Sequence, residues 1–76
     1  MPYSNDIIEE LNVLSLFNLD TDLEGIKVRS SAGELRVSAA QRLFDKGLTS
    51  QKDGGYLTSL GRTAAEHAQG LLQILK

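Results

Sequence analysis

Few residue types in this chain can carry out catalysis, and their spacing does not assemble a catalytic group. His67 is the single histidine, and it lies at the edge of an apolar stripe on a predicted helix, beside Leu71. A general base needs a cleft and an orienting partner, and Glu66 points away from His67 on the same helix. Ser30 and Ser38 have no histidine placed to activate them as nucleophiles. We therefore interpret His67 as a packed or interfacial side chain and predict that the chain is not an enzyme.

An acidic segment, residues 20–25, has the residue types of a calcium-binding loop without its complete pattern. Its oxygens and its glycine match positions 1, 3, 5 and 6 of an EF-hand loop. The twelfth position would be Ser31 instead of a bidentate glutamate, and the eighth would be Lys27, a positive charge beside the cation. The chain has no cysteine, which excludes zinc–thiolate clusters. We therefore predict no metal site and no cofactor.

Basic side chains supply a second candidate chemistry, the binding of phosphate. Residues 1–25 hold six acids and no base, whereas residues 26–76 hold eight bases and four acids, so the net charge of −2 conceals a separation of signs. A bipolar molecule can present its basic part to nucleic acid, and it can also pair head to tail with a second copy. In the alternative interpretation, both stretches are ordinary solvated faces.

Six residues of the second half are candidates for contacts with double-stranded DNA. Side chains of a recognition helix reach base edges, while residues before the helix and in a following hairpin meet the phosphate backbone. Arg36 and Arg42 are six residues apart, about 120° short of two full helical turns, so they do not share one narrow stripe. They are equally compatible with solvated arginines on an ordinary amphipathic helix. The predicted DNA contacts are Arg29, Arg36, Gln41, Arg42, Lys46 and Lys52.

The C-terminal segment supplies a candidate surface of another kind. Leucine, isoleucine and alanine recur there at helical spacing, with more apolar surface near the C-terminus than a chain of this size can bury internally. Two-fold pairing of such a stripe is the commonest closed assembly. We therefore predict a homodimer interface formed by Leu60, Ala64, His67, Leu71, Ile74 and Leu75.

Capping signals and apolar periodicity predict the first helix and the segment after it. Ser4 or Asn5 caps a helix over about residues 5–18. Residues 18–25 are rich in turn formers, and residues 26–29 alternate apolar and basic side chains like a short strand. The apolar stripe of this helix comprises Ile7, Ile8, Leu11, Leu14 and Phe17.

The second helix is bounded by two recognisable end signals. Ser31 and Glu34 have the spacing of a capping box, which predicts the start of the helix. Gly47 predicts its end in a Schellman motif, in which Leu48 would pack on Leu43. The predicted buried stripe of this helix is Leu35, Ala39, Ala40, Leu43 and Phe44.

A hairpin and a third helix complete the predicted elements. Asp53-Gly54 has the residue types of a tight turn between two short strands within residues 48–58. Thr58 or Ser59 then caps a helix that runs almost to the C-terminus. The whole is a small, mainly helical α+β fold of winged-helix type, with the short strand at 26–29 pairing with the hairpin.

Length and composition limit the class of protein. A chain of 76 residues buries only about 60 % of its unfolded surface, so its apolar side chains are needed for one core. We expect residues 1–76 to form a single domain without a small-molecule substrate. The chain lacks signal-peptide features, cysteine, and an apolar run of about 18 residues, which favours the cytoplasm and excludes a membrane span.

The order of elements and the segments 43–48 and 53–62 resemble winged helix-turn-helix regulators of the multiple-antibiotic-resistance-regulator type. In that pattern a recognition helix ends in a leucine-rich turn, an exposed hairpin follows, and L-T-x-x-G opens the next helix. The usual domain has two helices before its recognition helix, whereas this chain has one. The matching residues, within 31–72, are Leu43, Gly47, Leu48, Leu57, Thr58 and Gly61.

The chain, notably at residues 8–12, 16–20 and 64–68, is also similar to a small family of uncharacterised gammaproteobacterial proteins. That resemblance implies a bacterial source and no established activity. We therefore expect a non-enzymatic binding module that contacts DNA through the second helix and the hairpin. The alternative is a protein-interaction or dimerisation adaptor that does not bind DNA.

Overall fold

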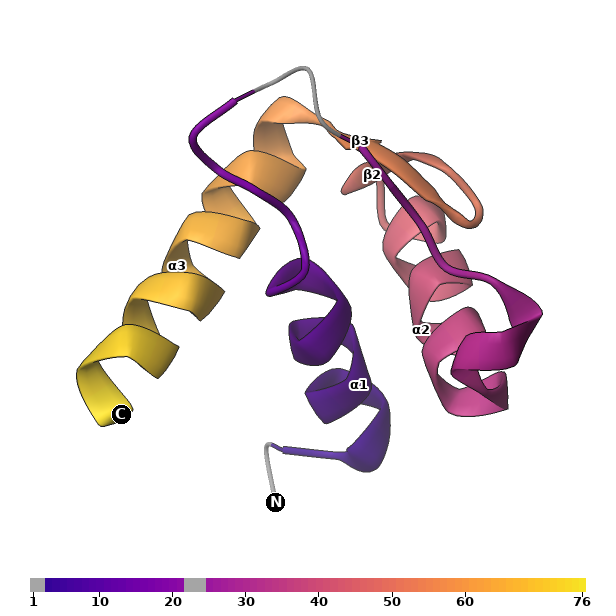
Figure 1. The fold of residues 1–76 in the computed structure, drawn as a ribbon, viewed down its shortest axis with the longest axis horizontal. Coiled ribbons are helices and arrows are strands. Elements are labelled where there is room, and N and C mark those ends of the chain that lie inside the picture. The colour runs from indigo at the N-terminus through magenta and orange to yellow at the C-terminus, as the bar shows by residue number, and fades with distance from the viewer. Residues whose placement is uncertain (1–2, 22–24) are drawn as a thin grey trace.

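The structure is a computed structural model that describes residues 3–21 and 25–76. Three helices and a small antiparallel sheet make up this part of the chain, with a hairpin between the second and third helices (Figure 1). The predicted fold class, a small and mainly helical α+β protein, is confirmed. The elements are α1 (Asn5–Leu14), β1 (Ile26–Lys27), a 3₁₀ turn η1 (Ser30–Ala32), α2 (Glu34–Asp45), β2 (Thr49–Gln51), β3 (Gly54–Leu57) and α3 (Ser59–Leu75).

Helix α1 begins as predicted and ends four residues earlier than predicted. The Ser4 hydroxyl accepts a hydrogen bond from the Ile7 amide at 3.2 Å, as an N-cap residue does. At the other end, the Gln69 side-chain amide of α3 donates to the carbonyls of Leu14 (3.1 Å) and Phe17 (2.7 Å). Because a side chain from α3 satisfies these carbonyls, the chain leaves the helix after Leu14 and turns Phe17 into the core.

The predicted capping box of α2 is wrong. Ser31 lies within the η1 turn, and α2 begins at Glu34 with Gly33 at its N-cap and no side-chain cap. Gly33 has a φ of 101°, a conformation that residues with a Cβ rarely adopt. The glycine therefore redirects the chain from η1 into the helix, and Ser31 ends up too early to cap it.

The C-terminal end of α2 forms the predicted Schellman motif. The Leu48 amide donates to the Leu43 carbonyl at 2.9 Å, the Gly47 amide donates to Phe44 at 3.0 Å, and Gly47 has a φ of 81°. The predicted buried stripe of the helix is only partly correct. Leu35, in the first turn, is 67 % exposed, and Phe44 is only partly buried.

The sheet has the strand order β1-β3-β2, with both pairs antiparallel. The predicted pairing of the 26–29 strand with the hairpin is therefore confirmed, although the strand is shorter. Gln51 pairs with Gly54, so the hairpin turn is Lys52-Asp53, one residue earlier than predicted. A Cβ on Gly54 would lie 2.7 Å from the Ile26 carbonyl oxygen, so glycine is required where β1 approaches β3.

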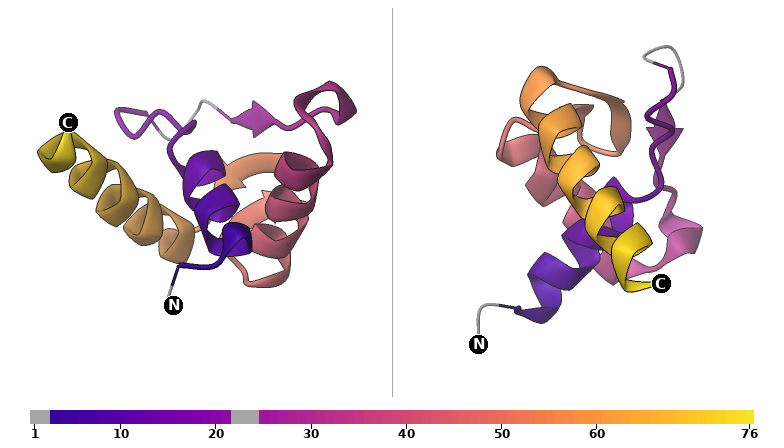
Figure 2. Two further views of the ribbon diagram at one scale, coloured as in Figure 1. Left: turned by 90° about the horizontal axis from the view of Figure 1, so that it is seen from below. Right: turned by 90° about the vertical axis from the view of Figure 1, so that its left-hand side faces the viewer.

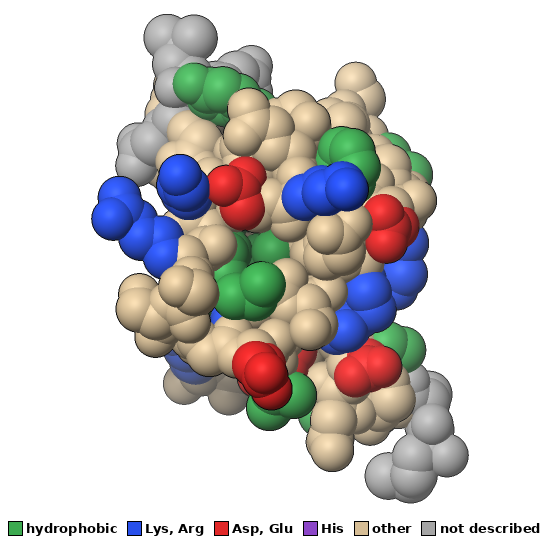
Figure 3. All heavy atoms as spheres, turned by 90° about the vertical axis from the view of Figure 1, so that its right-hand side faces the viewer, with side chains coloured by type: hydrophobic (Ala, Val, Ile, Leu, Met, Phe, Trp, Pro, Cys, Tyr) green, Lys and Arg blue, Asp and Glu red, His purple; other side chains and the backbone are tan. Residues whose placement is uncertain are grey.

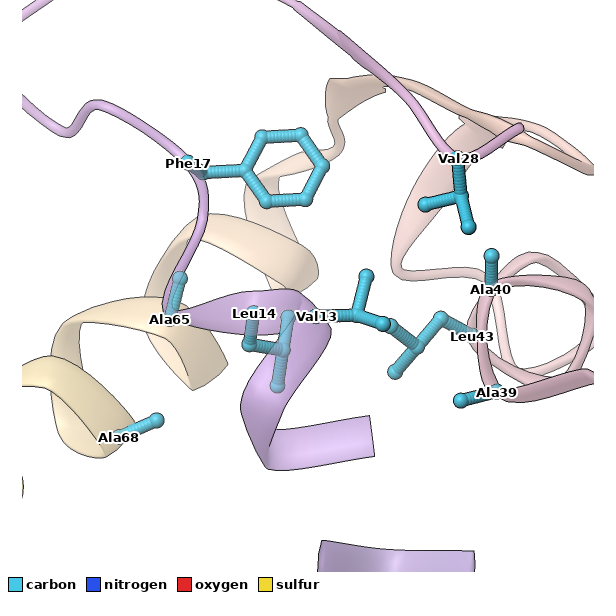
Figure 4. Close-up of a cluster of buried hydrophobic side chains, with 9 residues drawn as sticks. All are labelled: Val13, Leu14, Phe17, Val28, Ala39, Ala40, Leu43, Ala65 and Ala68. Atoms are coloured by element: carbon cyan, nitrogen blue, oxygen red, sulfur yellow. The ribbon is translucent and has the colours of Figure 1, made fainter. Parts of the chain in front are cut away.

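Helix α1 lies between α2 and α3, and the sheet covers one end of the helices (Figures 1 and 2). Val13 of α1 points toward Leu43 of α2, and both are fully buried (Figure 4). Small side chains on α2 and α3 allow the helices to approach α1 closely. No helix in the described part of the chain has the length and apolarity needed to cross a bilayer. The core comprises Val13, Leu14, Phe17, Val28, Ala39, Ala40, Leu43, Ala65 and Ala68.

Candidate interaction surfaces

Three of the predicted DNA contacts face the acidic side of α1 and are paired there. Arg42 donates through Nε to Glu10 Oε2 at 3.0 Å, and Lys46 Nζ bonds the other oxygen of the same carboxylate. A second Arg42 nitrogen donates to the Asp6 carbonyl at 3.2 Å. Arg36 Nε lies 3.7 Å from Glu9 Oε2. The structure therefore brings the basic residues of α2 together, but against carboxylates.

Glu10 is the centre of this cluster and is only 7 % exposed. Burial by itself raises the pKa of the Glu10 carboxyl, because the charged form loses its hydration. The hydrogen bonds from Lys46 and Arg42, together with their positive charges, outweigh burial, so the pKa lies below its usual value. Glu10 is thus a charged carboxylate at neutral pH that connects α1 to Arg42 of α2 and to Lys46 at the C-cap of that helix.

The remaining predicted DNA contacts lie apart from this cluster. Gln41 donates to Asp45 Oδ1 of its own helix at 3.1 Å. Arg29 and Lys52 are exposed, and no carboxylate of the described residues forms an ion pair with either. Lys27 is also exposed, and no carboxylate of the described residues forms an ion pair with it. Its backbone lies opposite Gly54 in the sheet, beside the hairpin turn. On the face seen in Figure 3, basic and acidic side chains alternate and form no continuous field of one sign.

The predicted dimer residues are mostly exposed on α3. Ile74 is 82 % exposed, Leu75 72 % and Leu71 55 %; Leu60 and His67 are also exposed, and Ala64 is partly buried. The charged residues in α3 and directly after it are Arg62, Glu66 and Lys76. Each lies about 140° or more from Leu71 around the helix axis. The exposed stripe of α3 is therefore uncharged.

Helix α1 extends this apolar surface in a way that the sequence analysis missed. Ile8 and Leu11 belong to the predicted apolar stripe of α1, and both are partly exposed. They line a hollow of about 170 Å³ between the two helices. An apolar spacing identifies one face of a helix without identifying whether another element covers all of it, so no sequence signal distinguished these residues. We define the α1–α3 face as Ile8, Leu11, Asn12, Ala68, Leu71 and Leu72, which line the hollow, with Ile74 and Leu75 beyond it.

Two other hollows in the described part of the chain are more polar. One is lined by Ser30, Glu34, Val37 and Ser38, and the other by side chains at the C-terminal ends of α1 and α3. Neither combines a nucleophile with a histidine, so neither has the arrangement that nucleophilic catalysis needs. The acidic 20–25 segment falls partly on residues 22–24, which lie outside the described residues.

Relatives of known function could help to interpret the α1–α3 face and the α1–α2 ion pairs. No curated protein and no solved structure matches the chain. The model of a family of unknown function (DUF5669) matches residues 1–76, and the chain belongs to that family.

Proposed function

We propose that this protein is a non-enzymatic interaction module that binds a protein partner through the α1–α3 face. The observation that carries the proposal is an exposed, uncharged apolar surface with a hollow in it, in a chain that needs its apolar residues for its core. Leu71, Ile74 and Leu75 contribute little to the fold, because more than half of each side chain remains in contact with water. Their cost in solubility is offset when a partner covers them.

The pairing of the α2 cations supports an adaptor over a protein that reads DNA through α2. A phosphate that approached Arg42 or Lys46 would meet two cations already bound to the Glu10 carboxylate, which neutralises part of their positive charge. Arg36 lies near the carboxylate of Glu9 at a longer distance, 3.7 Å. These contacts weaken the attraction between α2 and a polyanion.

A winged-helix interpretation is part of the same proposal. The order helix, strand, helix, hairpin, helix supports it, as does the position of β1 next to β3 of the hairpin. The similarity to uncharacterised gammaproteobacterial proteins supports a bacterial source. In this proposal the protein has the fold of a winged helix, but it binds its partner through the apolar α1–α3 face. Helix α2, which would contact DNA in a regulator of this type, does not serve as its binding surface.

DNA binding through the hairpin is the second candidate function. Arg29, Lys52 and Lys27 are exposed beside the sheet, and none is paired with a carboxylate of the described residues. Exposed cations of this kind contact the phosphate backbone without reading sequence. Such contacts would be weak and strongly dependent on salt.

An NMR titration of the full chain with a short DNA duplex distinguishes the two functions. We expect the amides around Arg36, Arg42 and Lys46 to stay unshifted at low and at physiological salt. Shifts confined to Arg29 and Lys52 that vanish with salt would identify the second candidate. Salt-sensitive shifts along α2 would overturn the adaptor proposal.

A further inference from the structure

We infer that the partner on the α1–α3 face is a second copy of this chain, related by a two-fold axis that passes near Leu71. This inference rests on the proposed function and names its partner. Three properties of the face support it: the area left exposed, the shape of the surface and the absence of charge.

The first property is the area that the chain leaves exposed. The chain has an accessible surface of 5291 Å². A monomeric protein of 8.3 kDa is expected to expose about 4,600 Å². The excess of about 700 Å² is close to the area of about 800 Å² that each partner buries in a standard protein interface. The C-terminal half of α3 projects away from α2 and the sheet (Figure 2), and its side chains Leu71, Ile74 and Leu75 are more than half exposed.

The second property is that the face is complementary to itself. It contains both a hollow, between α1 and α3, and two protruding side chains, Ile74 and Leu75. These two residues lie about one helical turn beyond Leu71, which lines the hollow. An antiparallel pairing of two α3 helices centred on Leu71 sets Ile74 of each copy opposite Ala68 of the other. Each copy then fills the hollow of its partner, as a two-fold interface requires.

The third property is the absence of charge. A partner with charged side chains in its contact surface would have to bury them against Leu71, Ile74 and Leu75 without any opposite charge. The exposed stripe of α3 itself has no Asp, Glu, Lys or Arg. Burying it against the same stripe of a second copy therefore buries no unpaired charge. An unrelated apolar helix is the competing occupant, and the test below distinguishes it.

Sedimentation equilibrium of the full chain, from about 10 µM to about 1 mM, tests the inference. We expect the mass to rise from 8.3 kDa toward twice that value. Leu71→Asp and Ile74→Asp should each weaken the dimer by at least about tenfold, because they bury a charge at the centre of the interface. Leu35→Asp is the matched control, because Leu35 is an exposed leucine on α2 whose exposure lies between those of Leu71 and Ile74, and it should leave the dimer unchanged. Amide NMR spectra confirm that each variant is folded.

Each other outcome has a definite meaning. A wild-type chain that stays monomeric at about 1 mM overturns the second copy as the partner, while the proposed function is then decided by the DNA titration. A dimer that survives both aspartate substitutions, or that Leu35→Asp weakens as much as they do, forms through another surface and overturns the inference, while the proposed function is again decided by the DNA titration. Between about 0.05 and 0.5 M salt we expect less than about a twofold change in dimer affinity. A loss of tenfold or more would indicate head-to-tail pairing of the acidic and basic parts and would also overturn the inference.

Discussion

Helix α1 has two flanks that differ in how completely they are covered. On the α2 flank, Val13 and Leu43 exclude water and Glu10 has two cationic partners. On the α3 flank, Ala65 and Ala68 pack against the core, but farther along the helices Leu11 and Leu71 border an open hollow. The difference shows that one helix completes the core on one flank and leaves apolar side chains exposed on the other. The flank that carries the ion pairs is completed within the chain, and the flank without charges is left open.

The largest expected effect is the difference in the free energy of unfolding lost when a buried and when an exposed leucine is shortened to alanine. Leu43→Ala should lower the free energy of unfolding by about 3 kcal/mol, because it leaves a cavity between α1 and α2. Leu71→Ala, at micromolar concentration, should change it by less than about 0.5 kcal/mol, because that side chain is more than half exposed. Urea denaturation measures both values. Equal losses would show that the α1–α3 face belongs to the folding core.

The next effect concerns the ion pairs on the α2 flank. Glu10→Gln should lower the free energy of unfolding by about 1–2 kcal/mol, since it removes the charge that holds Arg42 and Lys46 while both cations keep some access to water. Glu9→Gln is the control and should cost about 0–0.5 kcal/mol, because the contact with Arg36 is long and partly exposed. Thermal or urea denaturation of the two variants tests the contrast. Equal effects would contradict a special role for Glu10.

Gln69 is the polar connection on the α3 flank. Gln69→Ala should cost about 1 kcal/mol, because the carbonyls of Leu14 and Phe17 lose their donor at the end of α1. Gln73→Ala, one turn farther along α3 and exposed, should have no measurable effect. Hydrogen exchange of the last amides of α1 should accelerate only in the first variant. Unchanged exchange would show that another group ends the helix.

The smallest expected effect is on the pH dependence of stability. The pKa of Glu10 lies below its usual value of 4.5 in the folded chain. The unfolded chain therefore binds this proton more readily, and the stability contributed by Glu10 is present above pH 4.5 and lost as the pH falls through the lower folded pKa. The difference in stability between the wild type and Glu10→Gln should shrink below about pH 4.5 in urea denaturation curves. A constant difference at all pH values would contradict this assignment.

Local signals predicted the elements well where the interactions that form them are local. The Schellman motif at Gly47, the N-cap at Thr58 and the hairpin all depend on neighbouring residues, and the structure confirms them. The capping box at Ser31 failed because Gly33, which can adopt a positive φ, placed the helix start after it. The helix end at Leu14 was missed because its determinant, Gln69, lies 55 residues away in the sequence.

In the candidate sites, too, the features that depend on local spacing were predicted, and those that depend on contacts between distant helices were not. Apolar spacing on α3 was sufficient to identify Leu71, Ile74 and Leu75 as a stripe, and all three are exposed. The pairing of Arg42 with Glu10 could not be predicted, because it depends on the angle and offset between α1 and α2, which core packing determines. For the same reason the exposure of Ile8 and Leu11 appeared only when the space between α1 and α3 was known.

By itself, the sequence determined the order of the elements, the class of the fold and the uncharged stripe of α3, because helical and strand periodicity and end signals act over a few residues. The tertiary structure decided which basic residues are paired and which apolar residues remain open. Those properties depend on contacts between helices that are distant in the chain, and such contacts exist only after the core around Val13 and Leu43 has brought the helices together.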